Sequence, residues 1–119
     1  MNIKLKQNKY GNTPTYYDNI RFDSKKEANR YAELKLLLRA GEIMMLILQP
    51  KYVLIHSFIY RGKRIGAMTY SADFEYVDKS NMQTIVEDAK SVSTRKNEAY
   101  KMRKKLFMRE YPGLEFREV

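Results

Sequence analysis

The sequence contains no cysteine, no tryptophan and only one histidine. Without cysteine the chain has no disulfide framework and no thiolate metal site. The longest apolar run, from Ile43 to Leu48, is far shorter than the roughly 20 residues that cross a bilayer. The polar, basic N-terminus lacks the apolar core of a secretory signal, so a cytoplasmic location is expected.

Acidic residues are also scarce relative to basic ones, 14 against 23, which gives a net charge of +9. This balance indicates a polyanionic partner, with DNA favoured over an anionic membrane surface and over a basic protein without such a partner. A hydrophobic content of 44% predicts a folded chain, and the length fits one domain over residues 1–119. Residues 1–19 are predicted to form a basic arm, followed by a loop or short strand.

The hydrophobic pattern predicts an α/β fold with a mixed central sheet flanked by helices. Strands before and after the second helix favour one parallel pair beside antiparallel neighbours. Ser24 and Glu27 form a capping-box pattern at the start of the first helix. The expected helices are 24–40 and 94–111, the second capped by Thr94, and the expected strands are 43–48, 52–60, 64–77, 84–91 and 114–119.

Two of these strands, 64–77 and 84–91, carry acidic residues on either side of a polar loop. If the strands pair symmetrically about that loop, Asp73 lies opposite Asp88 and Ser71 lies opposite Lys90. Directly opposed Cβ atoms are about 5 Å apart, and like charges at that distance destabilise a sheet. Because a cation would remove this penalty, the pattern predicts a metal site with a lysine at its rim. The alternative interpretation is a pair of surface carboxylates and a cross-strand ion pair.

Alternation along a strand places Asp88 and Lys90 on one face. Glu87 then points to the opposite face, where a basic partner, the edge of the sheet or a bulge would accommodate it. A bulge would make Glu87 the second metal ligand in place of Asp88, so Glu87 is the second choice. Glu75 is a weaker candidate on the face of Asp73, and a structural role is expected for His56.

Asp73 followed by Asp88-Ala89-Lys90 resembles the motif of the PD-(D/E)xK nuclease superfamily, although Ala72 stands where that motif often has proline. Including the segment 22–28, which contains Glu27, the chain resembles small phage-associated members of the superfamily. The resemblance implies a restriction-endonuclease-like core of order α-β-β-β-α-β and, for a phage protein, a location in the bacterial host cell.

The resemblance further implies a DNA endonuclease that hydrolyses phosphodiester bonds with Mg²⁺, for which Mn²⁺ can substitute. Asp73 and Asp88 would bind the metal, Glu27 would assist, and Lys90 would serve the attacking water or the phosphate. Capping alone is an equal explanation of Glu27. Activity on branched DNA or junctions, as in recombination and repair, stays open, and so does a non-catalytic nucleic-acid-binding module with the same fold.

Basic residues that could contact DNA fall in three groups: the N-terminal arm, a turn between strands and the second helix. A homodimer would supply the two sites that a double-strand cut needs, and strand 43–48 with the first helix is the expected apolar surface for it. The expected DNA-binding residues are Lys4, Lys6, Lys9, Arg61, Lys63, Arg64, Arg95, Lys96, Lys101, Arg103, Lys104 and Lys105.

Overall fold

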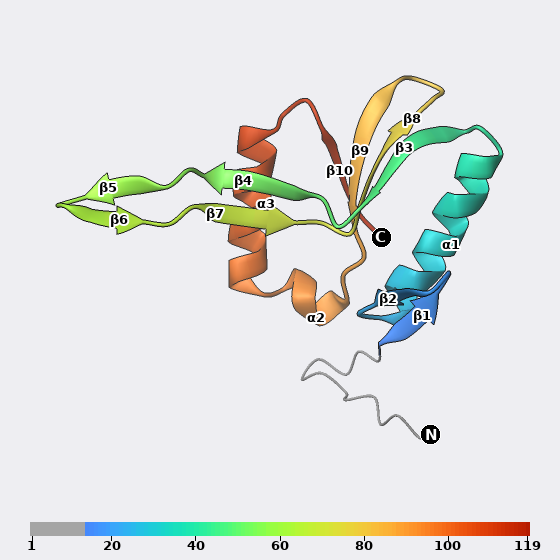
Figure 1. Ribbon diagram of the computed structural model, residues 1–119, viewed down its shortest axis with the longest axis horizontal. Coiled ribbons are helices and arrows are strands. Elements are labelled where there is room, and N and C mark those ends of the chain that lie inside the picture. The colour runs from blue at the N-terminus through green and yellow to red at the C-terminus, as the bar shows by residue number, and fades with distance from the viewer. Residues whose placement is uncertain (1–13) are drawn as a thin grey trace.

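The computed structural model describes residues 14–119 as a mixed α/β fold, with three helices and four small sheets in that range (Figure 1). Lys4, Lys6 and Lys9 lie outside the described residues. The helices are α1 (Lys25–Arg39), α2 (Val92–Arg95) and α3 (Glu98–Glu110). The strands are β1 (Thr15–Tyr17), β2 (Ile20–Phe22), β3 (Ile43–Leu48), β4 (Lys51–Ile55), β5 (Phe58–Tyr60), β6 (Lys63–Ile65), β7 (Met68–Ser71), β8 (Phe74–Asp78), β9 (Gln83–Asp88) and β10 (Glu115–Glu118).

The central sheet has the strand order β10-β9-β8-β3. Its β9–β10 pair is parallel and its other pairs are antiparallel, which confirms the expected single parallel pair. In the β8–β9 hairpin Phe74 lies opposite Glu87, and Asp78 lies opposite Gln83. This is the register predicted from the symmetric loop.

The two faces of the central sheet carry separate cores. Ile85 faces α1 together with Phe74, whereas its neighbour Val86 packs with Phe107 of α3. Both β9 residues are fully buried, because helices cover both faces of this strand. The strand that ends in Asp88 is therefore held rigidly at the middle of the molecule.

Helix α1 begins and ends as the sequence predicts. The Ser24 hydroxyl accepts a hydrogen bond from the backbone N–H of Glu27 at 3.1 Å and so satisfies a free donor of the first turn. Gly41, with φ +76°, follows the helix in the left-handed conformation that glycine adopts without strain. None of the helices in residues 14–119 is both long and apolar enough to cross a membrane.

The expected strands 52–60 and 64–77 are wrong as continuous elements. The first is divided into β4 and β5, and the second into β6, β7 and β8. The chain changes partner near Ala72, because β7 pairs with β4 whereas β8 pairs with β3 and β9. Ser71 consequently lies opposite Lys51 and not opposite Lys90.

The strands β4 to β7 form a two-stranded arm that projects from the body of the molecule (Figure 1). The arm is interrupted at residues 56–57 and 66–67, between its inner pair β4–β7 and its outer pair β5–β6. His56, expected inside a strand, is exposed at this interruption. Arg61 and Gly62 both have positive φ at the outer turn, as a tight type I′ hairpin turn requires.

The second helix also differs from its prediction, because two helices replace the single helix 94–111. Ser91 caps α2 and Asn97 caps α3. The Asn97 side chain accepts the N–H of Tyr100 at 3.1 Å, a local bond that competes with continuation of the helix through this point. The predicted final strand is confirmed as β10, and residues 15–22, partly expected as loop, form the β1–β2 hairpin.

Candidate functional site

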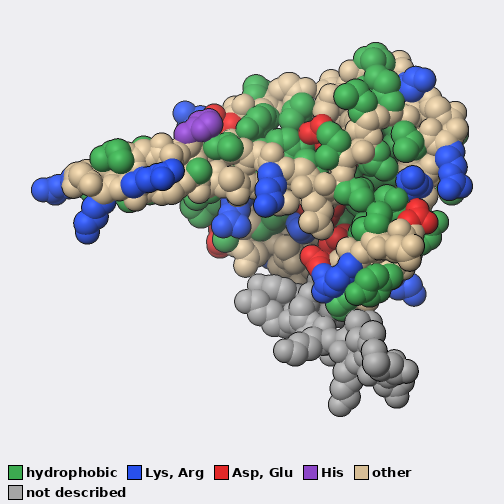
Figure 2. All heavy atoms as spheres, viewed as in Figure 1, with side chains coloured by type: hydrophobic (Ala, Val, Ile, Leu, Met, Phe, Trp, Pro, Cys, Tyr) green, Lys and Arg blue, Asp and Glu red, His purple; other side chains and the backbone are tan. Residues whose placement is uncertain are grey.

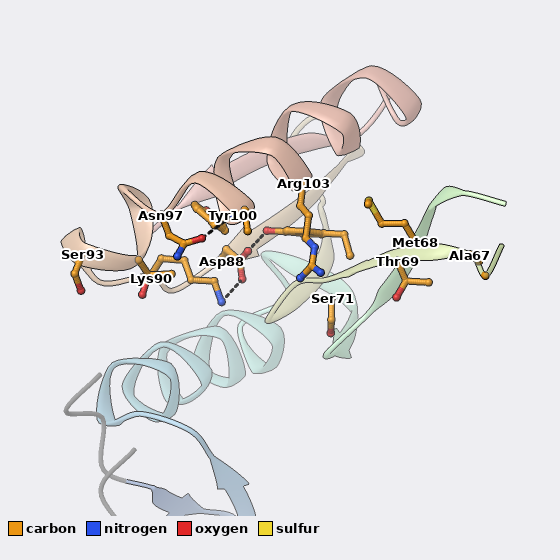
Figure 3. A pocket seen from close by; sticks show the side chains of 14 residues that line it. Ala67, Met68, Thr69, Ser71, Asp88, Lys90, Ser93, Asn97, Tyr100 and Arg103 are labelled. Carbon is orange, nitrogen blue, oxygen red and sulfur yellow. Dashed lines mark hydrogen bonds and ion pairs between the residues drawn. The ribbon is translucent and has the colours of Figure 1, made fainter. Parts of the chain in front are cut away.

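A groove of about 760 Å³ lies between β7 of the arm and the helices α2 and α3. Asp88 and Lys90, at the end of β9, line it together with Asn97 and Arg103 (Figure 3). Its walls thus offer an ammonium, a guanidinium and an amide beside one carboxylate. These groups suit a phosphate-containing ligand better than an apolar one.

Asp88 is fully buried, and its two oxygens differ in their surroundings. The Tyr70 hydroxyl donates a hydrogen bond to Oδ2. Oδ1 accepts no hydrogen bond from the described residues, although the Lys90 ammonium lies 3.4 Å away as an ion-pair partner. One oxygen of Asp88 is thus held by a hydroxyl, and the other faces the Lys90 ammonium.

Asp73 lies just before β8 rather than within a strand, which corrects its predicted position in a continuous strand. Its N–H donates to the carbonyl of Glu87 at 3.0 Å, and the β8–β9 pairing ends at Phe74 and Glu87, so the predicted pairing of Asp73 with Asp88 is not formed. Its side chain bends back, and Oδ2 accepts the N–H of Ala89 at 2.6 Å. Asp73 lines a second cavity of about 320 Å³, whereas Asp88 lines the groove.

Glu27 shares this second cavity with Asp73. Only 7% of Glu27 is exposed, although it stands in the first turn of α1. Its backbone N–H makes the capping bond to Ser24. This bond does not involve the carboxylate, and Glu27 lines the cavity. The Lys26 ammonium donates to the Lys90 carbonyl at 3.0 Å and ties the start of α1 to the end of β9.

Burial raises the pKa of all three carboxyl groups. Burial, together with the charges of Asp73 and Asp23, raises the pKa of Glu27 to about 7. Burial raises the pKa of Asp88 to about 6 and that of Asp73 above its usual range, and in both cases Lys90 opposes the rise.

Lys90 is the cation shared by these carboxylates. Its burial alone would lower its pKa, but the charges of Asp88, Asp73 and Glu27 outweigh that effect and raise it. The ammonium therefore stays protonated near neutral pH. The structure brings the four predicted site residues into one electrostatic unit, although the carboxylates line two cavities.

These pKa shifts predict an unusual pH dependence of stability. A carboxyl group with a raised pKa in the folded state holds its proton to higher pH than it does in the unfolded chain. The free energy of unfolding should then fall as pH rises from about 4 to about 7. Melting temperatures of wild type and Glu27→Gln at pH 5 and pH 8 check this, because the variant should show the smaller fall. A wild-type melting temperature that rises over this range would contradict it.

Glu87 points to the opposite face of β9, as alternation predicts, and is fully buried there. The Arg30 guanidinium donates to both of its oxygens, at 2.7 and 2.6 Å, and the Tyr76 hydroxyl donates to it as well. With these partners Glu87 holds α1 against the sheet. Asp88, which faces the groove, therefore remains the first choice of ligand.

Two residues that contact the candidate site residues, Arg30 and Tyr70, were not predicted from the sequence. Arg30 stands one helical turn after Glu27, a spacing that could have suggested a shared environment. Tyr70 gave no local signal, since its contact with Asp88 depends on the arm folding back over α3. Glu75, the weaker ligand candidate, accepts a hydrogen bond from the Tyr52 hydroxyl at 2.6 Å.

The predicted DNA-binding cations differ in whether an acidic side chain pairs with them. Glu118 of β10 engages both Arg95 and Lys104. Glu98 lies 3.4 Å from the Lys101 ammonium. Within the described range, the exposed cations without an acidic ion-pair partner include Arg103 in the groove, Lys96 and Lys105 elsewhere in residues 92–110, and Arg61, Lys63 and Arg64 at the outer turn of the arm. The three cations at the outer turn lie within four consecutive residues of the sequence.

The donor chemistry of the carboxylates fits a hard divalent cation, which prefers carboxylate oxygens. The Asp88 Oδ1 atom without a hydrogen bond supports this fit. As they stand, however, no three histidine, cysteine, aspartate or glutamate side chains of residues 14–119 form a group ready to hold a metal ion. Lys90 supplies the neutralising charge in this arrangement.

Residues 7–119 match the model of a family described as protein of unknown function DUF1064. The chain belongs to this family. No curated protein and no solved structure matches the chain. The family description assigns no activity, so a functional argument for this member of DUF1064 depends on the site itself.

Proposed function

We propose that this protein is a metal-dependent DNA nuclease with a restriction-endonuclease-like core, which hydrolyses phosphodiester bonds. The observation that carries the proposal is the Lys90–Asp88 pair, 3.4 Å apart in the open groove, with Asp73 and Glu27 in the adjoining part of the site close enough for their charges to act on Lys90. Buried carboxylates with raised pKa values beside a charged partner in a cleft are characteristic of functional sites. The mixed sheet and its parallel β9–β10 pair are compatible with such a core.

Asp88, Asp73 and Glu27 would hold the cation. A bound Mg²⁺ would polarise the phosphodiester and lower the pKa of a water bound to it. Tyr70 fixes one oxygen of Asp88, and the Ala89 N–H fixes one oxygen of Asp73, so each carboxylate is oriented by its own partner. The Lys90 ammonium, held protonated, would stabilise the charge that develops on the phosphate.

One observation favours a second candidate, a nucleic-acid-binding module without catalysis. Asp73 and Asp88 line separate cavities, and no acidic cluster of the described residues is ready for a metal. A chain that kept the basic groove but never brought these carboxylates together would bind DNA and leave it intact.

Cleavage of a panel of DNA substrates tests the proposal. Labelled duplex, single-stranded, flapped and four-way-junction DNA of matched sequence would be incubated with Mg²⁺, with Mn²⁺ or with EDTA. We expect cleavage of at least one substrate with either metal and none with EDTA. Binding of every substrate without cleavage in either metal would favour the non-catalytic module.

Glu27→Gln separates the two roles of Glu27. Glutamine can still occupy the third position of a capping box, so the melting temperature at pH 5 should stay near that of wild type. It is a poor substitute for a carboxylate on a divalent cation, so turnover should fall about tenfold or more. Ser24→Ala is the matched control, since it removes the cap bond but no carboxylate and should lower stability without this loss of turnover. Unchanged turnover in Glu27→Gln would leave Glu27 with the cap alone.

The proposed dimer surface is exposed in this chain. Strand β3 is an edge of the central sheet, and Met45 and Ile47 on it are 66% and 44% exposed. A homodimer through β3 would pair two sites for cutting both strands of a duplex. Sedimentation with and without a four-way junction is the measurement that separates a dimer from a monomer that nicks one strand.

A further inference from the structure

The outer part of the arm is exposed on both faces, unlike the inner part. Tyr52, Leu54 and Tyr70 of the inner pair β4–β7 are buried in the core around Phe107 of α3. Every residue of β5 and β6 is exposed, and Figure 1 shows this outer ribbon extending beyond the body. Because the outer ribbon adds nothing to either core, its apolar side chains need another explanation.

Those side chains include three large residues in a row. Phe58, Ile59 and Tyr60 are 48%, 67% and 60% exposed. The register places Phe58 opposite Ile65 and Tyr60 opposite Lys63, so both rings lie on one face of the ribbon with a lysine beside them. Ile59 and its partner Arg64 lie on the other face. The ribbon therefore has one face that combines aromatic rings with a positive charge.

Charge decides which kind of partner this face fits. No aspartate or glutamate occurs between residues 43 and 72, a range that includes the whole arm. The arm carries Lys51, Arg61, Lys63 and Arg64, and Figure 2 shows lysine and arginine side chains standing out along it. An uncompensated row of cations beside exposed rings complements a polyanion that also offers flat apolar surfaces. Nucleic acid with unpaired bases has both properties.

The arm is continuous with the candidate site. The lining of the groove begins on the arm, at Gly66, Met68 and Thr69, and reaches Asp88 and Lys90 (Figure 3). Gly66 at the edge of the groove follows directly on Ile65 of the outer ribbon, so a strand bound along the ribbon lies next to the groove. In a fully paired duplex the base faces are covered by their neighbours, so rings can stack only where bases are unpaired or at an end.

We propose that the outer ribbon binds nucleic acid by stacking Phe58 and Tyr60 on unpaired bases, while Arg61, Lys63 and Arg64 contact the adjacent phosphates. This deepens the proposed function, because it selects single-stranded or branched DNA as the substrate class of the groove. The ribbon's own binding does not depend on cleavage. Aromatic rings of this kind contribute to binding without reading sequence, so the preference concerns DNA structure and not base identity.

Binding of matched DNAs in EDTA tests the proposal without any requirement for catalysis. Fluorescence anisotropy would give the Kd of wild type for a labelled single strand, for a splayed duplex and for a blunt duplex of the same sequence. The test variant is Phe58→Ala/Tyr60→Ala. Ile59→Ala is the matched control, since it removes an exposed apolar side chain from the opposite face of the same strand. Melting temperatures should be equal for all three proteins, because none of these residues lies in a core.

We expect the double variant to lose affinity for the single strand and the splayed duplex by about thirtyfold or more, as two stacked rings imply. Its affinity for the blunt duplex and the affinities of Ile59→Ala should change by less than about threefold. The salt dependence should persist in the double variant and flatten in Lys63→Gln/Arg64→Gln, which lose phosphate contacts.

Three results would overturn the proposal. The first is wild-type affinity of the double variant for the single strand. The second is an equal loss on all three DNAs, which would mean that the rings do not distinguish unpaired bases. The third is self-association of wild type that the double variant abolishes, which would assign the ribbon to a second copy of the chain. Each of these leaves the cleavage experiment untouched, and a failure to cleave would leave the binding result standing.

Discussion

Asp88→Asn and Asp73→Asn are each expected to lower DNA cleavage by about a thousandfold or more while the protein stays folded. Each substitution removes a negative oxygen from the proposed cation site, and stabilisation of transition-state charge by a metal is worth several kcal/mol. Folding should persist because burial already favours the neutral form of both groups, as their raised pKa values indicate. Single-turnover assays measure the cleavage rate, and circular dichroism measures whether the protein stays folded.

Glu87→Gln is the control for these variants, because Glu87 is as fully buried as Asp88 and stands next to it on β9. The substitution leaves Arg30 without its charged partner and should lower the free energy of unfolding by about 3 kcal/mol. Turnover of the fraction that remains folded should be close to wild type. A loss of cleavage in Glu87→Gln together with normal cleavage in Asp88→Asn would transfer the ligand role to Glu87.

Lys90→Ala is expected to reduce the rate at saturating DNA by about a hundredfold or more, with a Kd changed by less than about threefold. Lys90 is only one of many cations that can hold the DNA backbone, but among residues 14–119 it is the one that forms an ion pair with Asp88, at 3.4 Å. Arg103→Gln gives the converse test. Arg103 lines the same groove without contacting an acidic side chain of the described residues, so its loss should weaken binding and spare the saturated rate.

Quenched-flow or gel assays with excess protein separate the cleavage rate from the Kd, since they give the rate within the bound complex. If Lys90→Ala weakened binding and left the rate at saturation unchanged, Lys90 would be a phosphate contact only. If Arg103→Gln lowered the saturated rate as much as Lys90→Ala does, Lys90 and Arg103 would not have the separate roles in chemistry and binding that we propose.

The parts of the fold that follow from local rules could be predicted from the sequence. Helix α1 was predictable because Ser24 and Gly41 mark its ends, and strand β3 because its apolar run is bounded by turns. The β8–β9 register followed from a polar loop between two alternating segments. Alternation alone also gave the opposite directions of Asp88 and Glu87.

Features that depend on distant parts of the chain could not be predicted in this way. The predicted strand 64–77 is interrupted near Ala72 because β7 pairs with β4, and no local sequence pattern indicates that change of partner. The contact of Tyr70 with Asp88 and that of Arg30 with Glu87 join elements far apart in the sequence. For the same reason the symmetric loop predicts Asp73 opposite Asp88, whereas the pairing ends at Phe74 and Glu87 and the two aspartates line separate cavities.

A Mg²⁺ titration of cleavage by wild type and Asp88→Asn, purified in parallel, is the sharpest test of the proposed metal site. The substrate would be a splayed DNA that both proteins bind with the same Kd in EDTA. We expect a wild-type rate that rises with Mg²⁺ to a plateau and an Asp88→Asn rate about a thousandfold lower at every concentration. Equal rates in the two proteins, or bound DNA that wild type leaves uncut in both Mg²⁺ and Mn²⁺, would contradict it.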